Sequence, residues 1–226
     1  MYNLDACKGK VDYKSLMHKI TLVAGNEKNF KEFLMKSFNI IGNSIRVSRV
    51  YYFSYEQDKH KVSNILEWVC DNTLKEQDNL QSISCYDVDW FYRMLITNKL
   101  IKFSNINEIS DIKTKELLIQ QHIKSILVVP IYVHNEFKGF VGYDQCDYNR
   151  EWNDYDEFIL YTLAIMSAQS IKESFLKEAI MREHRQLLAI VDNLQGLSYA
   201  VDRETYNIIY ANNELKKLYN QKLEGK

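Results

Sequence analysis

The chain of 226 residues is poor in the features that usually reveal an enzyme. It has one proline and seven glycines, and it contains no glycine-rich phosphate loop, no nucleophile elbow and no catalytic motif of a histidine kinase or cyclase. Its four cysteines form no CxxC pair and its five histidines stand singly, so the spacing of a zinc site is absent. We therefore expect neither catalysis nor a metal centre from these residues.

Neither an excess of charge nor a long apolar run is present. The 29 lysines and arginines nearly equal the 30 aspartates and glutamates, so no net field would attract nucleic acid or an anionic membrane. The longest fully apolar stretch, Ile126 to Tyr132, is too short to cross a bilayer, and the N-terminus is polar. We expect a soluble cytoplasmic fragment with reduced thiols, which binds neither nucleic acid nor a membrane.

Hydrophobic periodicity divides the first part of the chain into helices and strands. Apolar residues recur at helical spacing in two segments, Tyr13 to Val23 and Asn29 to Ile41. Two segments rich in β-branched and aromatic residues, Val47 to Tyr55 and Val62 to Cys70, predict a hairpin. A less regular region predicts the loop-rich wall of a pocket, and it spans Asp71 to Ile112, with a short helix at Asp87 to Thr97 and a strand at Leu100 to Phe103.

The segment that follows carries the clearest local signal. After a short helix over Thr114 to His122, two apolar strands within Ile123 to Trp152 are joined at Asn135-Glu136 to Gly139 and lead into a capped helix. The whole sheet should then have about five or six strands. Pro130 lies inside an apolar strand, and because proline cannot donate to a ladder, it predicts an edge or bulge position.

A long helix is predicted next, from Asn153 to about Leu194, which is about 60 Å at 1.5 Å per residue. In its second half, residues recur at alternating spacings of four and three, as in a coiled-coil seam with one charged member: Leu176, Ile180, Glu183, Leu187, Ile190 and Leu194. We predict parallel pairing with the same helix of a second chain, which makes a homodimer. Packing of this helix on its own domain is the alternative.

Two signatures in the predicted strands resemble those of a known family. Ser63, Asn64, Glu67, Trp68 and Cys70 match one signature, and Gly139 to Asp144 with Arg150 and Trp152 match the other. On these residues, the segment 13–172 resembles the GAF domain of bacterial sensor proteins. The resemblance implies an α+β fold, a central antiparallel sheet with helices on one face and a small-molecule pocket on the other, and no catalytic role.

The last residues resemble the opening of another sensor module. After Gly196 the pattern is a strand, a turn at Asp202 to Thr205, a second strand ending in the step Tyr210-Ala211-Asn212, and a helix, as at the start of a PAS domain. We therefore predict a GAF sensor domain over 13–172, a helical signalling linker over 173–194 and a truncated PAS start over 195–226. About 35 residues cannot bury a PAS core alone, so the chain is expected to be a fragment.

The resemblance implies a function in signal transduction. We expect a regulatory module that senses a small molecule and controls an output domain outside this sequence, with a diguanylate cyclase (GGDEF) domain as the first choice and a histidine kinase as the alternative. A GAF-fold thiol reductase that uses Cys70, Cys85 and Cys146 is the enzymatic alternative, although the sequence around these cysteines does not resemble that family.

Candidate ligand-pocket residues come from the signatures and from the aromatic residues of the loop-rich wall: Tyr52, Asn64, Glu67, Trp68, Trp90, Phe91, Phe103, Tyr143 and Arg150. Strand alternation predicts Asn64 and Trp68 on one side of their strand and Glu67 on the other. Because a buried carboxylate needs a partner, we expect an ion pair between Glu67 and Arg150, with a structural role favoured over ligand contact.

The cofactor stays unknown from the sequence. Asn149-Arg150, Trp152 and Asp156-Glu157 weakly resemble elements of cyclic-nucleotide-binding GAF domains, but the acidic pair is equally explained as the first turn of a helix. Covalent bilin attachment commonly uses a Cys-His pair, which the chain lacks. No ligand spacing supports haem binding by His60, His122 or His134.

Overall fold

The structure is a computed structural model and describes residues 11–27, 29–97 and 100–219. It divides into two compact units, with the boundary between Lys172 and Glu173. In the first unit the helices are α1 (Tyr13–Asn26), α2 (Phe30–Ile45), α3 (Asp89–Ile96), α4 (Ile112–Gln120) and the first part of α5 (Asp154–Asp192), with short 3-10 helices at Gln57–Lys59 and Ile106–Glu108. The strands are β1 (Arg49–Glu56), β2 (Lys61–Val69), β3 (Ile83–Ser84), β4 (Ile101–Phe103), β5 (Ser125–Val133) and β6 (Glu136–Gln145).

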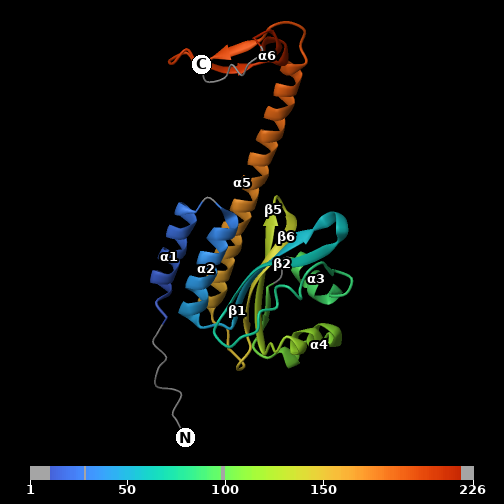
Figure 1. The fold of residues 1–226 in the computed structure, drawn as a ribbon. Helices are drawn as coiled ribbons and strands as arrows, with labels where there is room; N and C mark the ends of the chain where they lie inside the picture. The colour runs from blue at the N-terminus through green and yellow to red at the C-terminus, as the bar shows by residue number, and fades with distance from the viewer. Residues whose placement is uncertain (1–10, 28, 98–99, 220–226) are drawn as a thin grey trace. The chain divides into compact units, whose positions relative to one another are not determined.

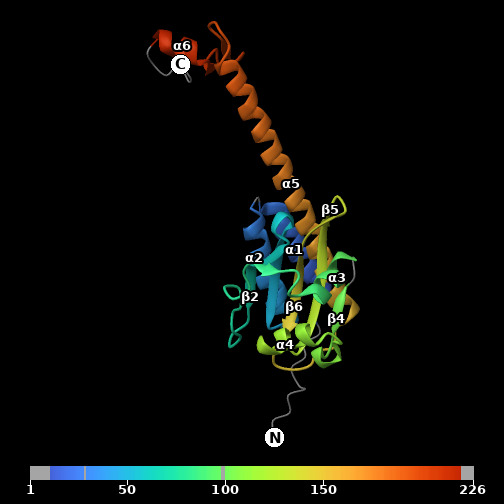
Figure 2. The ribbon, with the colours of Figure 1, turned by 90° about the vertical axis from the view of Figure 1, so that its right-hand side faces the viewer.

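The strands form one six-stranded sheet in the order β3-β2-β1-β6-β5-β4, and every neighbouring pair is antiparallel. Helices α1, α2 and the first part of α5 cover one face of this sheet, whereas α3 and α4 lie on the other (Figures 1 and 2). The predicted α+β fold is thus confirmed, including the size of the sheet and the separation of its two faces.

A continuous apolar core fills the space between the sheet and the first set of helices, and this side is called the helix face below. Its centre includes Phe38 and Ile41 of α2, Val50 of β1 and Leu160 of α5, all of them fully buried. Side-chain caps fix where the helices begin, because Asp12 accepts from the amide of Ser15 and Asn29 accepts from those of Lys31 and Glu32.

The hairpin between β5 and β6 turns earlier in the chain than predicted. His134 and Asn135 form the two-residue turn, both with left-handed φ angles of 51° and 63°, which asparagine tolerates well. Gly139 instead lies within β6 at φ 146°, where a Cβ would come within 2.0 Å of the carbonyl oxygen of Phe53. Pro130 lies two residues beyond the last β5 pair with β4, so β5 is an edge on that side, as predicted.

The second unit contains the remainder of α5, a hairpin of β7 (Tyr199–Val201) and β8 (Ile208–Ala211), and α6 (Asn213–Tyr219). Asp202 holds the turn by accepting from the amides of Glu204 and Thr205, and the Tyr210 hydroxyl donates to Asp192 at 2.9 Å. The predicted strand, turn, strand and helix are confirmed here, while residues 220–226 of the predicted PAS segment lie outside the described residues.

Helix α5 continues unbroken to Asp192. None of the helices in the described part of the chain combines the length and apolarity that a membrane span requires.

Candidate ligand pocket

A cavity of about 70 Å³ lies on the sheet face opposite α1, α2 and α5, and this side is called the pocket face below. Strands β1, β2, β5 and β6 supply its floor, and α3, α4 and the segment between β2 and β3 supply its walls. Its aromatic lining consists of Tyr51, Phe53, Phe91, Tyr92, Phe137 and Phe140. Its polar lining consists of Asn64, Glu67, Thr114, Gln121 and Asp144. An apolar cavity with a few polar groups is the usual form of a small-molecule site.

Four of these aromatic rings, those of Tyr51, Phe53, Phe91 and Phe140, contact one another and form a wall of the cavity. Phe53 and Phe140 lie on neighbouring strands and stack with ring centroids 4.6 Å apart, while Phe91 of α3 meets Phe140 edge-on at 5.7 Å. Tyr51 meets Phe53 edge-on at 5.6 Å. Contacts of these geometries are favourable for aromatic pairs, so the wall is well ordered without the help of a ligand.

A β-bulge decides which side chains of β2 reach the cavity. Phe53 pairs with Asn64 and Tyr52 pairs with Leu66, so Ile65 is the extra residue opposite this step. Because side chains alternate along a strand, one extra residue reverses the faces on either side of it. Asn64 therefore lines the cavity together with Glu67, whereas Trp68 lies on the helix face. The predicted alternation, with Asn64 beside Trp68 and opposite Glu67, is wrong for this reason.

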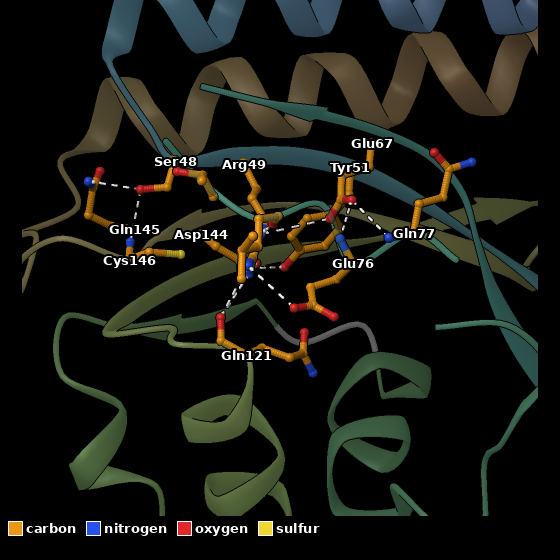
Figure 3. Close-up of polar contacts among 12 residues, drawn as sticks. Ser48, Arg49, Tyr51, Glu67, Glu76, Gln77, Gln121, Asp144, Gln145 and Cys146 are labelled. Carbon is orange, nitrogen blue, oxygen red and sulfur yellow. Dashed lines mark hydrogen bonds and ion pairs between the residues drawn. The ribbon is translucent and has the colours of Figure 1, made fainter. Parts of the chain in front are cut away.

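A buried arginine anchors the polar end of the pocket. Arg49, 1% exposed, donates from Nε to the carbonyl oxygen of Leu74 at 3.1 Å and from Nη1 and Nη2 to that of Gln121 at 3.2 and 3.1 Å (Figure 3). Gln121 follows α4, and Leu74 belongs to the segment after β2. The one side chain therefore holds two walls of the pocket to β1.

Three carboxyl groups surround the same guanidinium without a close hydrogen bond to it. The nearest oxygens of Asp144, Glu67 and Glu76 lie 3.6, 3.9 and 4.0 Å from its nitrogens. The Glu67 carboxylate accepts instead from the backbone amides of Glu76 and Gln77 at 2.8 and 2.9 Å. Burial nevertheless raises the pKa of Glu67, against the opposite effect of these two amides and of Arg49.

Asp144 occupies the most perturbed position of this group. Burial raises the pKa of Asp144 from 3.8 to about 7, although Arg49 and the Tyr51 hydroxyl, which donates to it at 2.9 Å, both favour the ionised form. Gly142 makes the tyrosine contact possible, because a Cβ there would come within 2.5 Å of the Tyr51 ring. The absence of that side chain lets the ring lie across β6 and reach Asp144.

Comparison with solved structures decides the fold. A phycocyanobilin-bound GAF domain from a cyanobacterial phytochrome superimposes with a TM-score of 0.63 at 16% identity, over 75% of this chain and 98% of that domain. The GAF domain of a phosphoenolpyruvate-protein phosphotransferase from Coxiella burnetii gives 0.63 at 14% identity, over 74% of this chain and 96% of that domain. The chain has the GAF fold.

Sequence comparison adds a distant relative. The methanogenesis regulatory histidine kinase FilI of Methanothrix harundinacea (strain 6Ac) is 22% identical over 184 residues, which cover 78% of this chain and 20% of that protein. The chain thus spans about a fifth of the length of the curated relative that it matches. No family model matches the sequence.

The lining of the cavity contains three of the predicted ligand-pocket residues, namely Asn64, Glu67 and Phe91. Trp90 and Phe103 pack against each other, with centroids 6.1 Å apart, in the apolar cluster of the pocket face but outside the cavity lining. The remaining four lie on or beside the helix face: Tyr52, Trp68, Tyr143 and Arg150.

The expected ion pair between Glu67 and Arg150 is wrong. Arg150 pairs with Asp156, the fully buried aspartate of the first turn of α5, at 3.3 Å, and its guanidinium lies 5.0 Å from the centre of the Trp152 ring. Glu67 lies instead beside Arg49, 3.9 Å from its Nε. The signal in the sequence that could have indicated Arg49 is that it is the only charged residue in the predicted strand Val47 to Tyr55. Asp144 gave the same signal, and its burial opposite Arg49 depends on the pairing of β1 with β6.

The thiols give no support to the reductase alternative. Cys70, Cys85 and Cys146 are all unpaired, and Cys7 lies outside the described residues. Burial raises the pKa of Cys85 to about 11 and that of Cys146 to about 11, so both stay protonated near neutral pH. The thiolate is the reactive form of cysteine, and these two positions disfavour it.

Proposed function

We propose that this chain is a regulatory GAF module that binds a small molecule in the pocket described above and controls an output domain outside the sequence. The observation that carries the proposal is the cavity itself, which has an aromatic wall and few polar groups. Beside the cavity, the buried Arg49 ties the end of α4 and the segment after β2 to the sheet. A ligand that contacts these walls can shift their position, and such a shift is what a sensor must pass on.

A histidine kinase is the output that we favour. The support is the relative FilI, a histidine kinase, which matches this chain over 184 residues. A diguanylate cyclase, the first choice from the sequence, stays a second possibility that rests on the resemblance of residues 199–206 to the PAS openings that precede diguanylate cyclase domains. A truncated PAS start over 195–226 belongs to the same proposal.

Ligand binding can be tested with a panel of metabolites in thermal unfolding measurements. We expect at least one compound to raise the melting temperature of the wild type, because a ligand that binds only the folded state stabilises it by mass action. Val88→Trp, which places an indole at the half-buried wall of the cavity, should abolish that shift. Leu22→Trp on exposed α1 is the matched control and should keep it. A panel without any hit at millimolar concentration would contradict the proposal.

Signal transmission requires a route out of the pocket, and we propose pairing of α5 with α5 of a second copy. The predicted seam carries large apolar side chains that are about half exposed or more: Leu176, Ile180, Leu187, Ile190 and Leu194. Their spacing is that of a parallel two-stranded coiled coil, with Glu183 as the single charged member. A change of register or crossing along such a pair can reach whatever follows.

The pairing predicts a dimer at micromolar concentration in light scattering. Ile180→Glu with Leu187→Glu should give a monomer whose first unit keeps its melting temperature, because these residues lie outside that unit. Met181→Glu with Leu188→Glu introduces the same two charges at the same spacing but off the seam, and should stay dimeric. A wild-type monomer would contradict the pairing.

A further inference from the structure

The polar groups of the pocket differ in whether the protein already satisfies them. The Glu67 carboxylate is held by two backbone amides, and the Asp144 carboxyl is held by the Tyr51 hydroxyl and lies 3.6 Å from Arg49. The amide nitrogen of the Gln121 side chain donates to the carbonyl oxygen of Leu117. These groups have protein partners in the absence of any ligand.

Asn64 is different. Its residue is 1% exposed and lines the cavity, yet neither its side-chain oxygen nor its side-chain nitrogen has a hydrogen-bond partner within the described ranges 11–97 and 100–219, residue 28 aside. A buried polar group without a partner costs free energy, and native proteins rarely leave both ends of one carboxamide unpaired. The bulge at Ile65 is what turns this side chain toward the cavity.

The surroundings of Asn64 restrict what can pair with it. Phe53 is its cross-strand neighbour and stacks on Phe140, so a group bound at Asn64 lies beside a flat aromatic wall. The lining includes the carboxyl groups of Glu67 and Asp144, and among the described residues it includes no lysine or arginine, which disfavours an anion. The cavity of about 70 Å³ is less than half of the roughly 150 Å³ that holds a benzene ring, so only a few heavy atoms fit inside.

We propose that the pocket recognises the uncharged amide edge of its ligand, a primary amide or a lactam, through a two-point hydrogen bond with Asn64. The Asn64 nitrogen would donate to the ligand carbonyl, and the Asn64 oxygen would accept from the ligand N–H. Both contacts are possible at once only where the ligand shows its N–H and C=O on the same side, as primary amides and lactams do. This inference rests on the proposed function, because it names the chemical class that the sensor pocket takes.

Three isomers of one formula test this geometry. Propionamide presents N–H and C=O on one edge, N-methylacetamide holds them on opposite edges because its trans form is favoured by about 2.5 kcal/mol, and dimethylformamide has no N–H. Binding to the whole chain can be followed by NMR, from the shifts of the Phe53, Asn64 and Phe140 signals. We expect propionamide to bind at least tenfold more tightly than either isomer, with a dissociation constant in the millimolar range.

Two variants connect the preference to Asn64. Asn64→Leu should remove the tenfold preference, whereas Ser37→Ala should keep it, because it deletes a buried hydroxyl of α2 that likewise has no partner in the described part of the chain. Equal binding of the three isomers, no binding of any of them at 100 mM, or a preference that survives in Asn64→Leu would each overturn the inference. The metabolite panel with Val88→Trp tests ligand binding in the pocket independently of Asn64. A hit in that panel without the preference for propionamide would leave the proposed function intact and overturn only this inference.

Discussion

The two faces of the sheet are built from the same strands, but they use their buried positions differently. On the helix face, Val50, Val141 and Leu127 belong to a continuous apolar core beneath the helices. On the pocket face the alternating neighbours include Arg49, Tyr51 and Asp144, which form a buried charged group beside a cavity. One face thus resembles an ordinary core, whereas the other keeps polar groups that a core optimised for stability would replace.

This difference indicates that the two faces have different tasks. A hydrophobic face gains free energy from every buried methylene. The pocket face instead contains an arginine shared by three carboxyl groups and an asparagine whose side chain has no partner among the described residues. Such arrangements are expected where binding matters more than stability, and substitutions on the two faces can measure how far this holds.

The largest effect is expected at Arg49. Arg49→Leu leaves Asp144 and Glu67 buried without their cation and frees the carbonyl oxygens of Leu74 and Gln121, so we expect a loss of about 3 to 5 kcal/mol in the free energy of unfolding. Urea denaturation measures it. Arg93→Leu removes an exposed ion pair with Asp89 and should cost at most about 0.5 kcal/mol. Equal losses for the two variants would mean that the buried group is not a stabilising unit.

The next effect is a dependence of stability on pH that comes from Asp144. Its pKa is about 7 in the folded chain and about 4 in the unfolded chain, so the folded state binds the extra proton between these values. The contribution of the Asp144 proton to the free energy of unfolding is therefore present at low pH and is lost as the pH rises through about 7. It amounts to at most about 4 kcal/mol.

Asp144→Asn should remove this slope. The variant should gain stability relative to the wild type between pH 5 and pH 8, in paired urea titrations at the two values. Asp111→Asn is the control, because hydrogen bonds at the start of α4 lower the pKa of Asp111 below 3.8. The contribution of Asp111 to stability is therefore lost only as the pH falls below about 4, so this variant should keep the wild-type slope between pH 5 and pH 8. An unchanged difference between wild type and Asp144→Asn across this range would show that Asp144 does not titrate there.

Most of the fold could be predicted from the sequence because it depends on local periodicity. The helices over Phe30–Ile45 and Asp154–Asp192 and the strands β1, β2, β5 and β6 follow directly from helical spacing or from apolar and β-branched runs. The turn of the β5–β6 hairpin was misplaced, because His134 adopts a left-handed conformation that the sequence does not demand. The sequence signal for a turn is stronger at Asn135-Glu136.

The pocket was less predictable because it depends on one inserted residue and on distant pairs. The bulge at Ile65 has no clear sequence signal, yet it moves Asn64 from the expected side of β2 to the other. Arg49 meets Gln121 and Asp144 across 72 and 95 positions of sequence, and only the strand order brings them together. The two signatures predict Trp68 and Arg150 as ligand candidates, but Trp68 lies on the helix face and Arg150 pairs with Asp156.

A smaller effect is expected from glycine-to-alanine substitutions, one in α2 on the helix face and one in β6 on the pocket face. A Cβ at Gly42 would meet the ring of Trp68 at 2.0 Å, and a Cβ at Gly142 would meet the ring of Tyr51 at 2.5 Å. Both Gly42→Ala and Gly142→Ala should therefore cost about 1 to 3 kcal/mol through overpacking. Thermal unfolding measures this loss.

The two glycine variants should differ in what else they change. Gly142→Ala displaces the Tyr51 hydroxyl from Asp144, and since that hydrogen bond favours the ionised carboxylate, the pKa of Asp144 should rise further. Gly42→Ala should leave the titration of Asp144 unchanged, because Trp68 lies on the other face. An identical pH dependence in both variants would remove the distinction between the faces that the Tyr51–Asp144 contact provides.

The smallest effect has the opposite sign and concerns Asn64. Asn64→Leu replaces two buried polar atoms, which have no hydrogen-bond partner among the residues that the structure describes, by an apolar side chain of similar size. We therefore expect the unliganded protein to become more stable by about 0.5 to 2 kcal/mol. Urea denaturation at fixed pH measures the gain.

Asn64→Asp is the informative control for that gain, because it keeps a polar side chain at the same place but adds a third acidic group to the lining that already holds Glu67 and Asp144. It should destabilise the protein, most clearly above pH 7, where Asp144 is ionised as well. If Asn64→Leu is destabilising to the same degree, then the Asn64 carboxamide stabilises the folded protein, and the pocket face gives up no stability at this position. A gain in stability in Asn64→Leu would instead show that the bulge at Ile65 places a polar side chain where the fold alone does not need one. Asn64 would then show at one position that the pocket face, unlike the helix face, keeps a polar group that lowers stability.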